Sequence, residues 1–597
     1  MTTKPAGQTG GIRQRSFAMS SASFSTSPTA LRIICVQANP TVGALQGNFD
    51  IVRRHRERYR GKADLLVFSE CFGTGYPLQD LVLRPGFRRD FRDALDALAG
   101  EMRGDGGPAV LVGGPLDGSA LPHNAAFLIE TDGSMKIVLK HTLPNDEVYD
   151  ERRVFAPGPL PSPVDFRGFR LGIAICEDFW HGKVAQALAA EGAEVLIVPN
   201  GSHFRTGKQA VRLAIGRRTV KATGLPILYV NQVGGQDSLV FDGGSYVMDR
   251  AGLVIAQAGF HECDFDITVE RGEDGGVDLR RGDVLGMVQN GYPDEPEAMY
   301  RALVLGLRDY VNKNGFPGVV LGMSGGIDSA LSAAVAVDAL GADRVLLVRM
   351  PSPYTSAESM EDAERAAALL GTRLLTVPIA PAMDAFDGML APVFADRPVP
   401  AGDTTFENVQ ARIRGMTLMA LSNRLGLMVL STGNKSEMSV GYATLYGDMC
   451  GGYSVLKDVY KTVVFRLARW RNTQWPFGPG PSGLLGPQGA VMPDRIIAKP
   501  PSAELREGQT DEQALGAYEH LDAVLATMVE GLTGADRAAE LASVAVGQTI
   551  STAYAERIGR MTARAQYKRD QSPPGVVVTE RTYGPGWRLP VTNHYGL

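Results

Sequence analysis

The chain has 597 residues, which is too long for one hydrophobic core and predicts about two to four domains. Hydrophobic residues make up 44% and charged residues 21%, as in ordinary soluble globular proteins. The net charge of −5 provides no polycationic surface, and no apolar segment is long enough to span a bilayer, so neither nucleic acid nor a membrane is an expected partner.

Residues 1–30 differ from the rest of the chain. They contain Lys4, Arg13 and Arg15, no acid, and many Ser, Thr and Gly, which superficially matches a transit peptide. We expect instead a disordered tail, or a start codon placed too early with Met19 as the true start. The five cysteines include no CxxC pair, which favours free thiols in a reducing compartment, the cytoplasm.

Short apolar runs rich in Val, Ile and Leu begin at residue 31. Runs such as "LRIICVQANP", "ADLLVFSE" and "RLGIAICED" are bounded by Gly, Pro, Asn or polar residues and predict buried strands. Helical patterns lie between some of them, at residues 87–102 and 207–223. Residues 31–270 are therefore predicted to form one α/β domain.

A polar stretch, "RGEDGGVDLRRGD", then interrupts the pattern near residues 271–283. It predicts either an exposed hairpin or a linker, which we place at residues 271–292. A helix follows, beginning at Asp294 or Glu295 and ending at Gly315. Strands and helices then alternate again, so residues 293–597 are predicted to form a second α/β domain. Its Gly/Pro-rich residues 475–489 predict an irregular surface insertion.

Three reactive side chains lie where predicted strands of the first domain end. Glu70 follows "LLVFS", Lys140 follows "MKIVL" and Cys176 follows "LGIAI". Functional groups gather at such ends in α/β sheets. Two acids directly after Cys176 disfavour its thiolate, but a nearby lysine would favour it and a glutamate could accept the thiol proton. The pattern favours a nucleophilic cysteine over an inert core thiol.

The segments "VFSECFGTGYPLQDL", "KHTLPNDEVYDERRVFAPG", "AICEDFW" and "VPNGSHFRTGK" resemble the glutaminase branch of the nitrilase superfamily over roughly residues 31–270. The resemblance implies a four-layer αββα sandwich with a Glu–Lys–Cys triad. Glu70 would be the base, Lys140 the stabiliser of the intermediate and Cys176 the nucleophile. Glu151 would be an additional acid that supports the triad.

The same resemblance implies a glutamine-binding set. Ser202 and Lys208 would bind glutamine, and Glu177 would bind its α-ammonium group. One position departs from the family, because relatives often carry Tyr directly after "LPN" and this chain has Asp146. Tyr149 is nearby but out of register.

The second domain opens with "VVLGMSGGIDSALSAAVA", a Gly-rich turn between a buried strand and a helix. Glycines allow close approach of an anion to backbone amides and the helix N-terminus, and Asp328 could hold Mg²⁺, although a Gly-Gly turn also occurs as mere chain geometry. "SGGxDS" resembles the loop of N-type ATP pyrophosphatases, which implies a Rossmann-like, doubly wound parallel sheet. The implied ATP-binding residues are Gly322, Met323, Ser324, Gly325, Gly326, Ile327, Asp328 and Ser329.

Further sequence motifs indicate which substrate accepts the nitrogen. "MPSPYTSAESMEDA", "TGNKSE", "KPPSAELREGQTDE" and "QYKRDQSPPG" resemble the NAD synthetase family, and this resemblance covers residues 31–597. Read alone, "TGNKSE" is also compatible with a capped helix start whose charges are solvated. The implied roles are Thr432 for ATP; Asn408, Glu437 and Lys568 for deamido-NAD; and Asp328 with Glu437 for Mg²⁺. Lys461 and Asp448 are weaker candidates.

The two resemblances together predict one reaction. Glutamine hydrolysis would supply ammonia, and ATP would adenylate deamido-NAD, yielding NAD, AMP, pyrophosphate and glutamate. The alternatives are an amidotransferase of the same class with another acceptor, or an ammonia-dependent synthetase with a non-catalytic nitrilase-like module. The expected partners are glutamine, ATP, deamido-NAD and further copies of the chain in a homo-oligomer, such as an octamer.

Overall fold

The computed structural model describes residues 29–593 except 147, 273–274, 283–291 and 475–482. Most of the predicted tail at residues 1–30 therefore lies outside the described residues. So do much of the stretch at 271–292 and the first half of the predicted insertion at 475–489.

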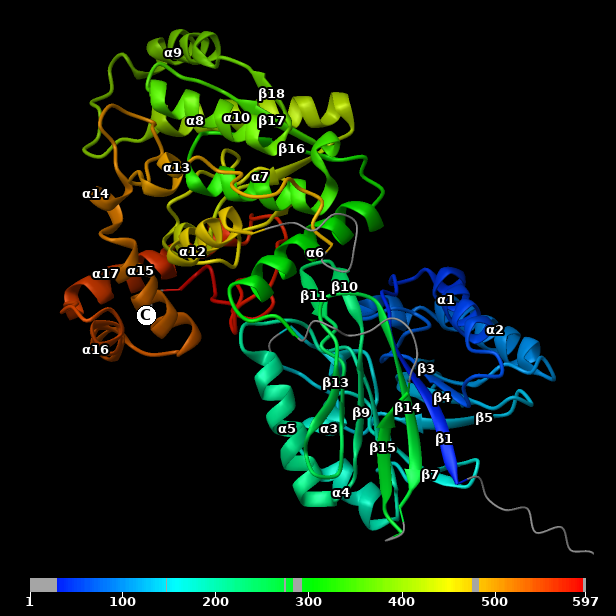
Figure 1. Cartoon of the computed structure of the whole chain (residues 1–597). Helices are drawn as coiled ribbons and strands as arrows, with labels where there is room; N and C mark the ends of the chain where they lie inside the picture. The colour runs from blue at the N-terminus through cyan, green and yellow to red at the C-terminus, as the bar shows by residue number, and fades with distance from the viewer. Residues whose placement is uncertain (1–28, 147, 273–274, 283–291, 475–482, 594–597) are drawn as a thin grey trace, which may run out of the picture.

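Two β-sheets form the centre of the first domain (Figure 1). The first has the strand order β15-β14-β1-β2-β3-β4-β5 and the second has the order β13-β12-β9-β8-β7-β6. The strands of the first sheet are β1 Ala30–Gln37, β2 Leu65–Val67, β3 Ala109–Leu116, β4 His123–Ile129, β5 Met135–Leu139, β14 Cys263–Arg271 and β15 Val277–Arg281. Those of the second are β6 Val164–Phe166, β7 Phe169–Ile173, β8 Val195–Asn200, β9 Ile227–Asn231, β12 Tyr246–Met248 and β13 Val254–Gln257.

The two sheets pack on each other through buried aliphatic side chains, such as Ile33 of the first and Ile197 of the second. Buried side chains on the other face of the first sheet pack against helices α1 and α2, and those of the second pack against α4 and α5. These helices are α1 Leu45–Arg58, α2 Pro85–Met102, α4 Lys183–Ala190 and α5 Lys208–Thr223. The layers are helix, sheet, sheet and helix, so the predicted four-layer sandwich is confirmed.

The polar stretch near residues 271–283 contains a strand of the first domain. β15 pairs antiparallel with β14 at the edge of the first sheet. Val277 and Leu279 are buried, while Asp278 and Arg280 between and after them are more exposed, which is the alternation of a strand with one solvated face. The hairpin alternative is therefore correct for this part, and the linker prediction is wrong for Val277–Arg281.

The second domain is built on a five-stranded parallel sheet with the order β18-β17-β16-β19-β20. The predicted doubly wound sheet is thus confirmed. The strands are β16 Val319–Gly322, β17 Val345–Arg349, β18 Arg373–Thr376, β19 Met428–Ser431 and β20 Tyr453–Ser454. Because the first strand, β16, is central, the order reverses beside it, and ligands bind at such a switch point.

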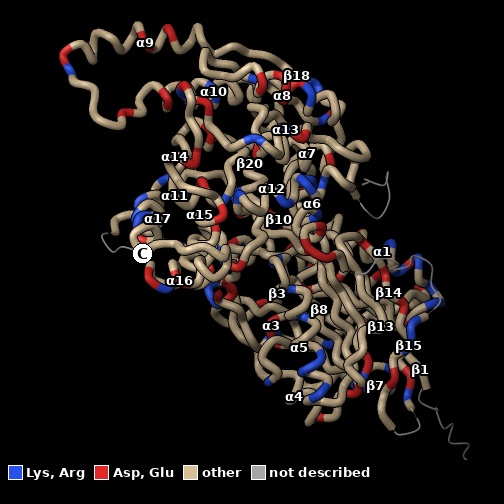
Figure 2. Tube along the Cα trace, turned by 60° about the vertical axis from the view of Figure 1, so that its left-hand side comes forward, with Lys and Arg blue, Asp and Glu red and all other residues tan. Residues whose placement is uncertain are grey.

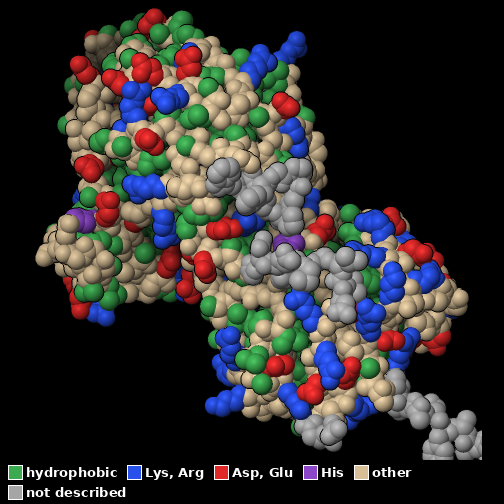
Figure 3. Space-filling model, in the orientation of Figure 1, with side chains coloured by type: hydrophobic (Ala, Val, Ile, Leu, Met, Phe, Trp, Pro, Cys, Tyr) green, Lys and Arg blue, Asp and Glu red, His purple; other side chains and the backbone are tan. Residues whose placement is uncertain are grey.

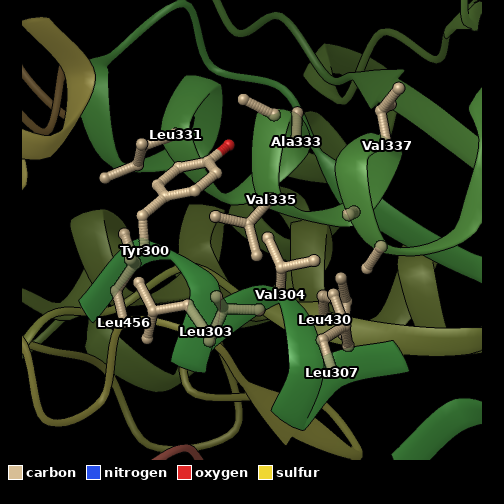
Figure 4. Close-up of a cluster of buried hydrophobic side chains, with 14 of the residues drawn as sticks. Tyr300, Leu303, Val304, Leu307, Leu331, Ala333, Val335, Val337, Leu430 and Leu456 are labelled. Atoms are coloured by element: carbon tan, nitrogen blue, oxygen red, sulfur yellow. The ribbon is translucent and has the colours of Figure 1, made fainter. Parts of the chain in front are cut away.

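The helix predicted from Asp294 or Glu295 to Gly315 is α6, which spans Glu297–Lys313. It packs against α7 (Ile327–Leu340) in a dry cluster in which Tyr300, Leu303 and Val304 meet Leu331 and Val335 (Figure 4). The remaining helices near the sheet are α8 Ala357–Leu370, α9 Ala380–Phe394, α10 Thr405–Leu425, α11 Lys435–Val440 and α12 Lys461–Asn472.

The hairpin of β10 (Val233–Gln236) and β11 (Leu239–Asp242) joins the two domains by packing on α6. The amide of Gly235 donates to Asp309 Oδ2 at 2.7 Å. A side chain at Gly235 would lie 3.1 Å from the backbone of Gly306, so two glycines allow this close approach.

Short helices complete the second domain. They are α13 Asp494–Ala498, α14 Asp511–Leu515, α15 Tyr518–Leu525, α16 Ala535–Val546, α17 Thr552–Arg564 and α18 Gln566–Arg569. Helices α15, α16 and α17 share a small apolar core that includes Leu521, Ala538 and Ile558. None of the described helices combines the length and apolar character needed to cross a bilayer.

Charged side chains are mixed over both domains. Figure 2 shows acidic and basic residues scattered along the trace of both domains. On the face drawn in Figure 3, side chains of both signs are interspersed on both domains. This distribution agrees with the small net charge of −5.

Candidate functional site

Cys176 lies where the chain leaves strand β7 and enters the short helix α3 (Glu177–Trp180). Its φ of 49° is positive, a conformation that side chains disfavour. The turn is held because the Cys176 amide donates to Pro199 O at 2.9 Å and the Phe179 amide donates to Cys176 O at 3.0 Å. Backbone strain of this kind is typical of functional turns.

A fully buried lysine lies between two carboxylates. Lys140 Nζ is 2.7 Å from Glu70 Oε1 and 2.7 Å from Glu151 Oε2. The side-chain amide of Asn124, a residue of β4, donates to Glu70 Oε1 at 2.8 Å and to Glu151 Oε1 at 3.2 Å. The structure therefore brings three of the four predicted catalytic side chains into one hydrogen-bonded group.

The charges in this group shift the pKa values of Lys140 and Glu151. Burial by itself would lower the pKa of Lys140, but Glu151 and Glu70 outweigh it and raise that pKa well above its usual range. Burial raises the pKa of Glu151 to about 7, because Lys140 offsets the burial only in part. Lys140 is therefore a fixed positive charge in the site.

The same charges shift the pKa of the Cys176 thiol. Burial raises its pKa well above the usual range, Glu70 and Glu177 add to that effect, and Lys140 opposes it. The acids next to the thiol thus hold its proton on, as the sequence predicts. A base is therefore needed to form the thiolate. Glu70 is the candidate, because its charge affects the pKa of this thiol more than that of any other acid.

Gly201 supports both the base and the nucleophile. Its amide donates to Glu70 Oε2 at 3.0 Å, and its influence lowers the pKa of the Cys176 thiol. A side chain at this position would lie 2.6 Å from the ring of Tyr76 and 3.1 Å from Glu70 Oε2. Only glycine leaves room for this close contact.

The predicted glutamine-binding residues surround the same turn. Ser202 is buried and its Oγ accepts from Arg212 Nε at 3.2 Å. Lys208 is buried, with Nζ 5.7 Å from the centre of the Trp180 ring. Glu177, which opens α3, accepts from His181 at 2.8 Å. We call residues 202–208 the glutamine loop.

Tyr149 lies against the glutamine loop although it is out of register with the family pattern. Its hydroxyl is 2.8 Å from Gly201 O and accepts from the His203 amide at 3.0 Å. Its ring stacks on Tyr76 with centroids 6.0 Å apart. Asp146 is exposed, so Tyr149 is the aromatic residue of this segment that contacts the loop.

The second domain contains a cavity of ≈ 360 Å³ at the switch point of its parallel sheet. Most of the predicted ATP residues line it: Gly322, Met323, Ser324, Gly326, Ile327, Asp328, Ser329 and Thr432. Gly325 turns the loop with a φ of +78°, and a side chain there would lie 2.3 Å from Ser359 O on α8. The loop leads directly into the N-terminus of α7, whose amides favour phosphate.

The two carboxylates predicted to hold metal face this cavity. Lys461 Nζ lies 2.5 Å from Asp328 Oδ2 and 3.1 Å from Glu437 Oε1, and Asn434 donates to Asp328 Oδ1 at 2.9 Å. Burial raises the pKa of Glu437 to about 7, with Lys461 opposing that shift. Within the described part of the chain, no three acidic, His or Cys side chains form a metal cluster. Two carboxylates suit Mg²⁺ when substrate phosphates supply further oxygens.

Comparison with known proteins identifies both halves of the chain. The carbon-nitrogen hydrolase family model matches residues 32–269, and the NAD synthase family model matches residues 299–572. A glutamine-dependent NAD(+) synthetase from Rhodobacter capsulatus is 46% identical over 94% of this chain and 98% of its own length. That from Xanthomonas campestris is 41% identical over 95% of this chain and 98% of its own.

A solved structure agrees with this similarity. Glutamine-dependent NAD+ synthetase from Acinetobacter baumannii, in complex with ADP, has a TM-score of 0.70 and 36% identity, covering 94% of this chain and 99% of its own. The chain belongs to the glutamine-dependent NAD(+) synthetase family. The predicted activity, ATP-dependent amidation of deamido-NAD with nitrogen from glutamine, is confirmed at the level of this family.

Two predicted deamido-NAD residues of the NAD synthetase domain, Asn408 and Lys568, are not among the residues that line the cavity, but both bond to residues near its wall. Asn408 Oδ1 accepts from Thr444 at 2.8 Å, and Lys568 Nζ donates to Gly441 O and Ala443 O at 2.7 Å each. Both therefore hold the loop that carries Thr444 and Asp448, which do line the cavity.

Sequence reasoning missed several residues of the two sites. Asn124 is a polar residue inside a buried strand, which is a signal that was present in the sequence. Gly201 and Tyr149 act through contacts between distant loops, which no local pattern reveals. Arg414 and Lys499 also line the cavity and add two basic side chains to its wall.

Proposed function

We propose that Cys176, Glu70 and Lys140 release ammonia from glutamine, and that the cavity of the second domain uses this ammonia to amidate adenylated deamido-NAD. The observation that carries the proposal is Lys140, buried at 2.7 Å from both Glu70 and Glu151 in the pocket of a strained cysteine. An inert core would not retain a cation and two carboxylates without a use, because burying them is costly.

In the first step, the thiol of Cys176 adds to the side-chain amide carbon of glutamine while Glu70 accepts the thiol proton. Lys140 stabilises the oxyanion that forms. Glu70 then passes its proton to the leaving nitrogen, and ammonia departs from a thioester. Water, deprotonated by Glu70, hydrolyses the thioester to glutamate and restores the thiol.

Substrate recognition in this step falls to the glutamine loop and α3. Ser202 and Lys208 bind glutamine, and Glu177 pairs with its α-ammonium group. This use of a carboxylate explains why Glu177 lies beside a thiol that it makes harder to ionise.

In the second domain, the loop from Gly322 to Ser329 binds the phosphates of ATP, and Thr432 contacts ATP. Asn408, Glu437 and Lys568 bind deamido-NAD, and Asn408 and Lys568 also bond to the loop that carries Thr444. Asp328 and Glu437 would hold Mg²⁺, which would supply positive charge for the leaving pyrophosphate. Lys461, placed between the same two carboxylates, keeps them close before substrates bind.

Cys176→Ala tests the division of labour. The variant is expected to lose NAD synthesis from glutamine by at least roughly a thousandfold and to keep synthesis from ammonium chloride. Cys263→Ala, at the first residue of β14, is the matched control and should keep both. Equal loss of both reactions in Cys176→Ala would contradict the proposal, as would full glutamine-dependent activity.

The proposal also includes a homo-oligomer and a cytoplasmic location. All five cysteines lie among the described residues and are unpaired, which favours a reducing compartment. Light scattering of the purified chain measures the oligomeric state, and fractionation of the source cells measures the location.

A further inference from the structure

Lys435, in the middle of "TGNKSE", is not a solvated charge. It is fully buried at the first position of α11, two residues before Glu437. Its Nζ lies 3.0 Å from Asp458 Oδ1, 3.2 Å from Glu530 Oε1, 2.6 Å from Thr579 Oγ1 and 2.9 Å from Arg581 O. The proposed reaction gives this lysine no role, so its partners indicate what it does.

Asp458, the buried partner of Lys435, holds the C-terminal segment at residues 575–581. One of its oxygens accepts from the amides of Val578 and Thr579 at 2.8 Å each. The hydroxyl of Thr579 also donates to this carboxylate at 2.8 Å. The segment also contacts β20, where Gly575 pairs with Ser454. The backbone of the segment is therefore fixed by the second domain.

The opposite edge of the segment contacts the first domain, where the two domains meet (Figure 1). The Val577 amide donates to Ser238 O at 2.9 Å. Val578 O accepts from the Thr206 amide at 3.0 Å and from its hydroxyl at 3.2 Å. Thr206 lies inside the glutamine loop. An ion pair of 3.4 Å between Arg205 and Glu580 adds a second contact to the same loop.

Val577 also reaches the surroundings of the catalytic residues. It packs in one apolar cluster with Cys71, which follows Glu70, and with Tyr76, whose ring covers Gly201. The segment thus touches the first domain at the glutamine loop and beside the base. The contacts form a continuous path from Lys435 through Asp458 and Val578 to Thr206.

We infer that residues 575–581 are a positioning element for the glutamine loop, held in place by Lys435 and Asp458 of the other domain. The inference rests on the proposed role of residues 202–208 in glutamine binding. Because Lys435 begins the helix that carries Glu437, substrates that order α11 also stabilise the loop through this path. Lys435 and Asp458 are positioning residues, since neither contacts the reacting atoms of glutamine.

Thr579→Val tests the inference with a change that keeps the side chain's shape. It removes the hydroxyl between Lys435 and Asp458 without leaving either charge unpaired, which Lys435→Met would do. The KM for glutamine is expected to rise roughly three- to tenfold, while the kcat with saturating ammonia changes less than about twofold. Thr206→Val removes one bond at the other end of the path and should shift the glutamine KM in the same direction.

Thr223→Val is the matched control. Its hydroxyl bonds within the C-terminal end of α5, to Thr219 O and the Leu225 amide, so both kinetic constants should stay unchanged. The inference is wrong if neither Thr579→Val nor Thr206→Val raises the glutamine KM above this control. It is also wrong if Thr579→Val slows the ammonia reaction as much as the glutamine reaction. Either result leaves the Cys176→Ala comparison, and hence the proposed function, intact.

Hydrogen exchange of the wild-type enzyme gives a second measurement that needs no variant. Peptides that cover residues 202–208 are expected to exchange more slowly once ATP and deamido-NAD are added, because α11 and residues 575–581 become more ordered. Unchanged exchange in the glutamine loop, with slower exchange in α11, would overturn the inference.

Discussion

Each domain holds a lysine between two carboxylates, but the surroundings of the two lysines differ. Lys140 lies between Glu70 and Glu151 in a closed pocket, where Asn124 and Gly201 occupy the remaining carboxylate oxygens. Lys461 lies between Asp328 and Glu437 at the wall of an open cavity of ≈ 360 Å³. In the first arrangement every carboxylate oxygen has a hydrogen-bond partner, whereas in the second both carboxylates line the cavity that we expect the substrates to enter.

This difference separates two uses of the same charge pattern. A site that forms a thioester needs only groups of the protein, arranged in advance. A site that binds ATP and a dinucleotide must balance several phosphate charges, which requires cations that arrive with the substrates. A lysine between the carboxylates keeps them together until then.

Removing divalent metal should give the largest difference between the two sites. With a chelator present, NAD synthesis from ammonia is expected to fall on the order of a thousandfold, because the Mg²⁺ that Asp328 and Glu437 are proposed to hold would no longer neutralise the pyrophosphate. Glutamate release from glutamine alone should keep most of its rate, and added Mg²⁺ should restore NAD synthesis. Equal loss of glutamate release would show that the first site also depends on metal.

Asn124→Ala is expected to have the second-largest effect, a loss of glutamine hydrolysis in the closed site. The amide bridges Glu70 and Glu151, so its loss leaves one oxygen of each buried carboxylate without this donor. We expect the kcat for glutamine hydrolysis to fall roughly ten- to a hundredfold, with ammonia-dependent synthesis unchanged. Asn48→Ala is the control, because Asn48 is also buried in this domain but bonds to Thr41. If the two variants lose equal activity, Asn124 only supports the fold.

The sequence predicts the reactive residues of the closed site better than the residues that hold them in place. Glu70, Lys140 and Cys176 each follow a short apolar run, so local patterns place them at strand ends. Asn124 could have been predicted from the sequence, because a polar residue in a buried apolar run needs a hydrogen-bond partner. The contact of Tyr149 with the glutamine loop depends on how two distant loops pack, and that packing is fixed only by tertiary structure.

The same limit applies to the fold. Central strands such as β16 and β8 are continuous apolar runs, because both of their faces are buried. The edge strand β15 has polar residues on its solvated side and therefore resembles a linker. Lys435 shows the reverse case, since a charge flanked by polar residues is normally solvated, and its burial depends on Asp458 and residues 575–581.

The pH dependence of glutamine hydrolysis tests the role of Glu151. Its pKa is raised to about 7, so the group is neutral below that pH and ionised above it. We expect the rate to fall as pH drops through about 7, by up to roughly tenfold per pH unit, because Lys140 loses one carboxylate partner. Glu151→Gln should lower the rate and remove this limb, while Glu101→Gln on the surface should keep it. An unchanged limb in Glu151→Gln would assign it to another group.

Tyr149→Phe is expected to have the smallest effect. The ring still stacks on Tyr76, but the hydroxyl that contacts Gly201 O and the His203 amide is lost. The KM for glutamine should rise roughly three- to tenfold, with less change in kcat, because the loop is held less firmly while Lys140 and Glu70 stay in place. Tyr59→Phe, which removes a hydroxyl bonded to Asp264 away from the loop, is the control. A drop in kcat without a change in KM would place the hydroxyl in the chemical step, through the Gly201 amide that supports both Glu70 and Cys176.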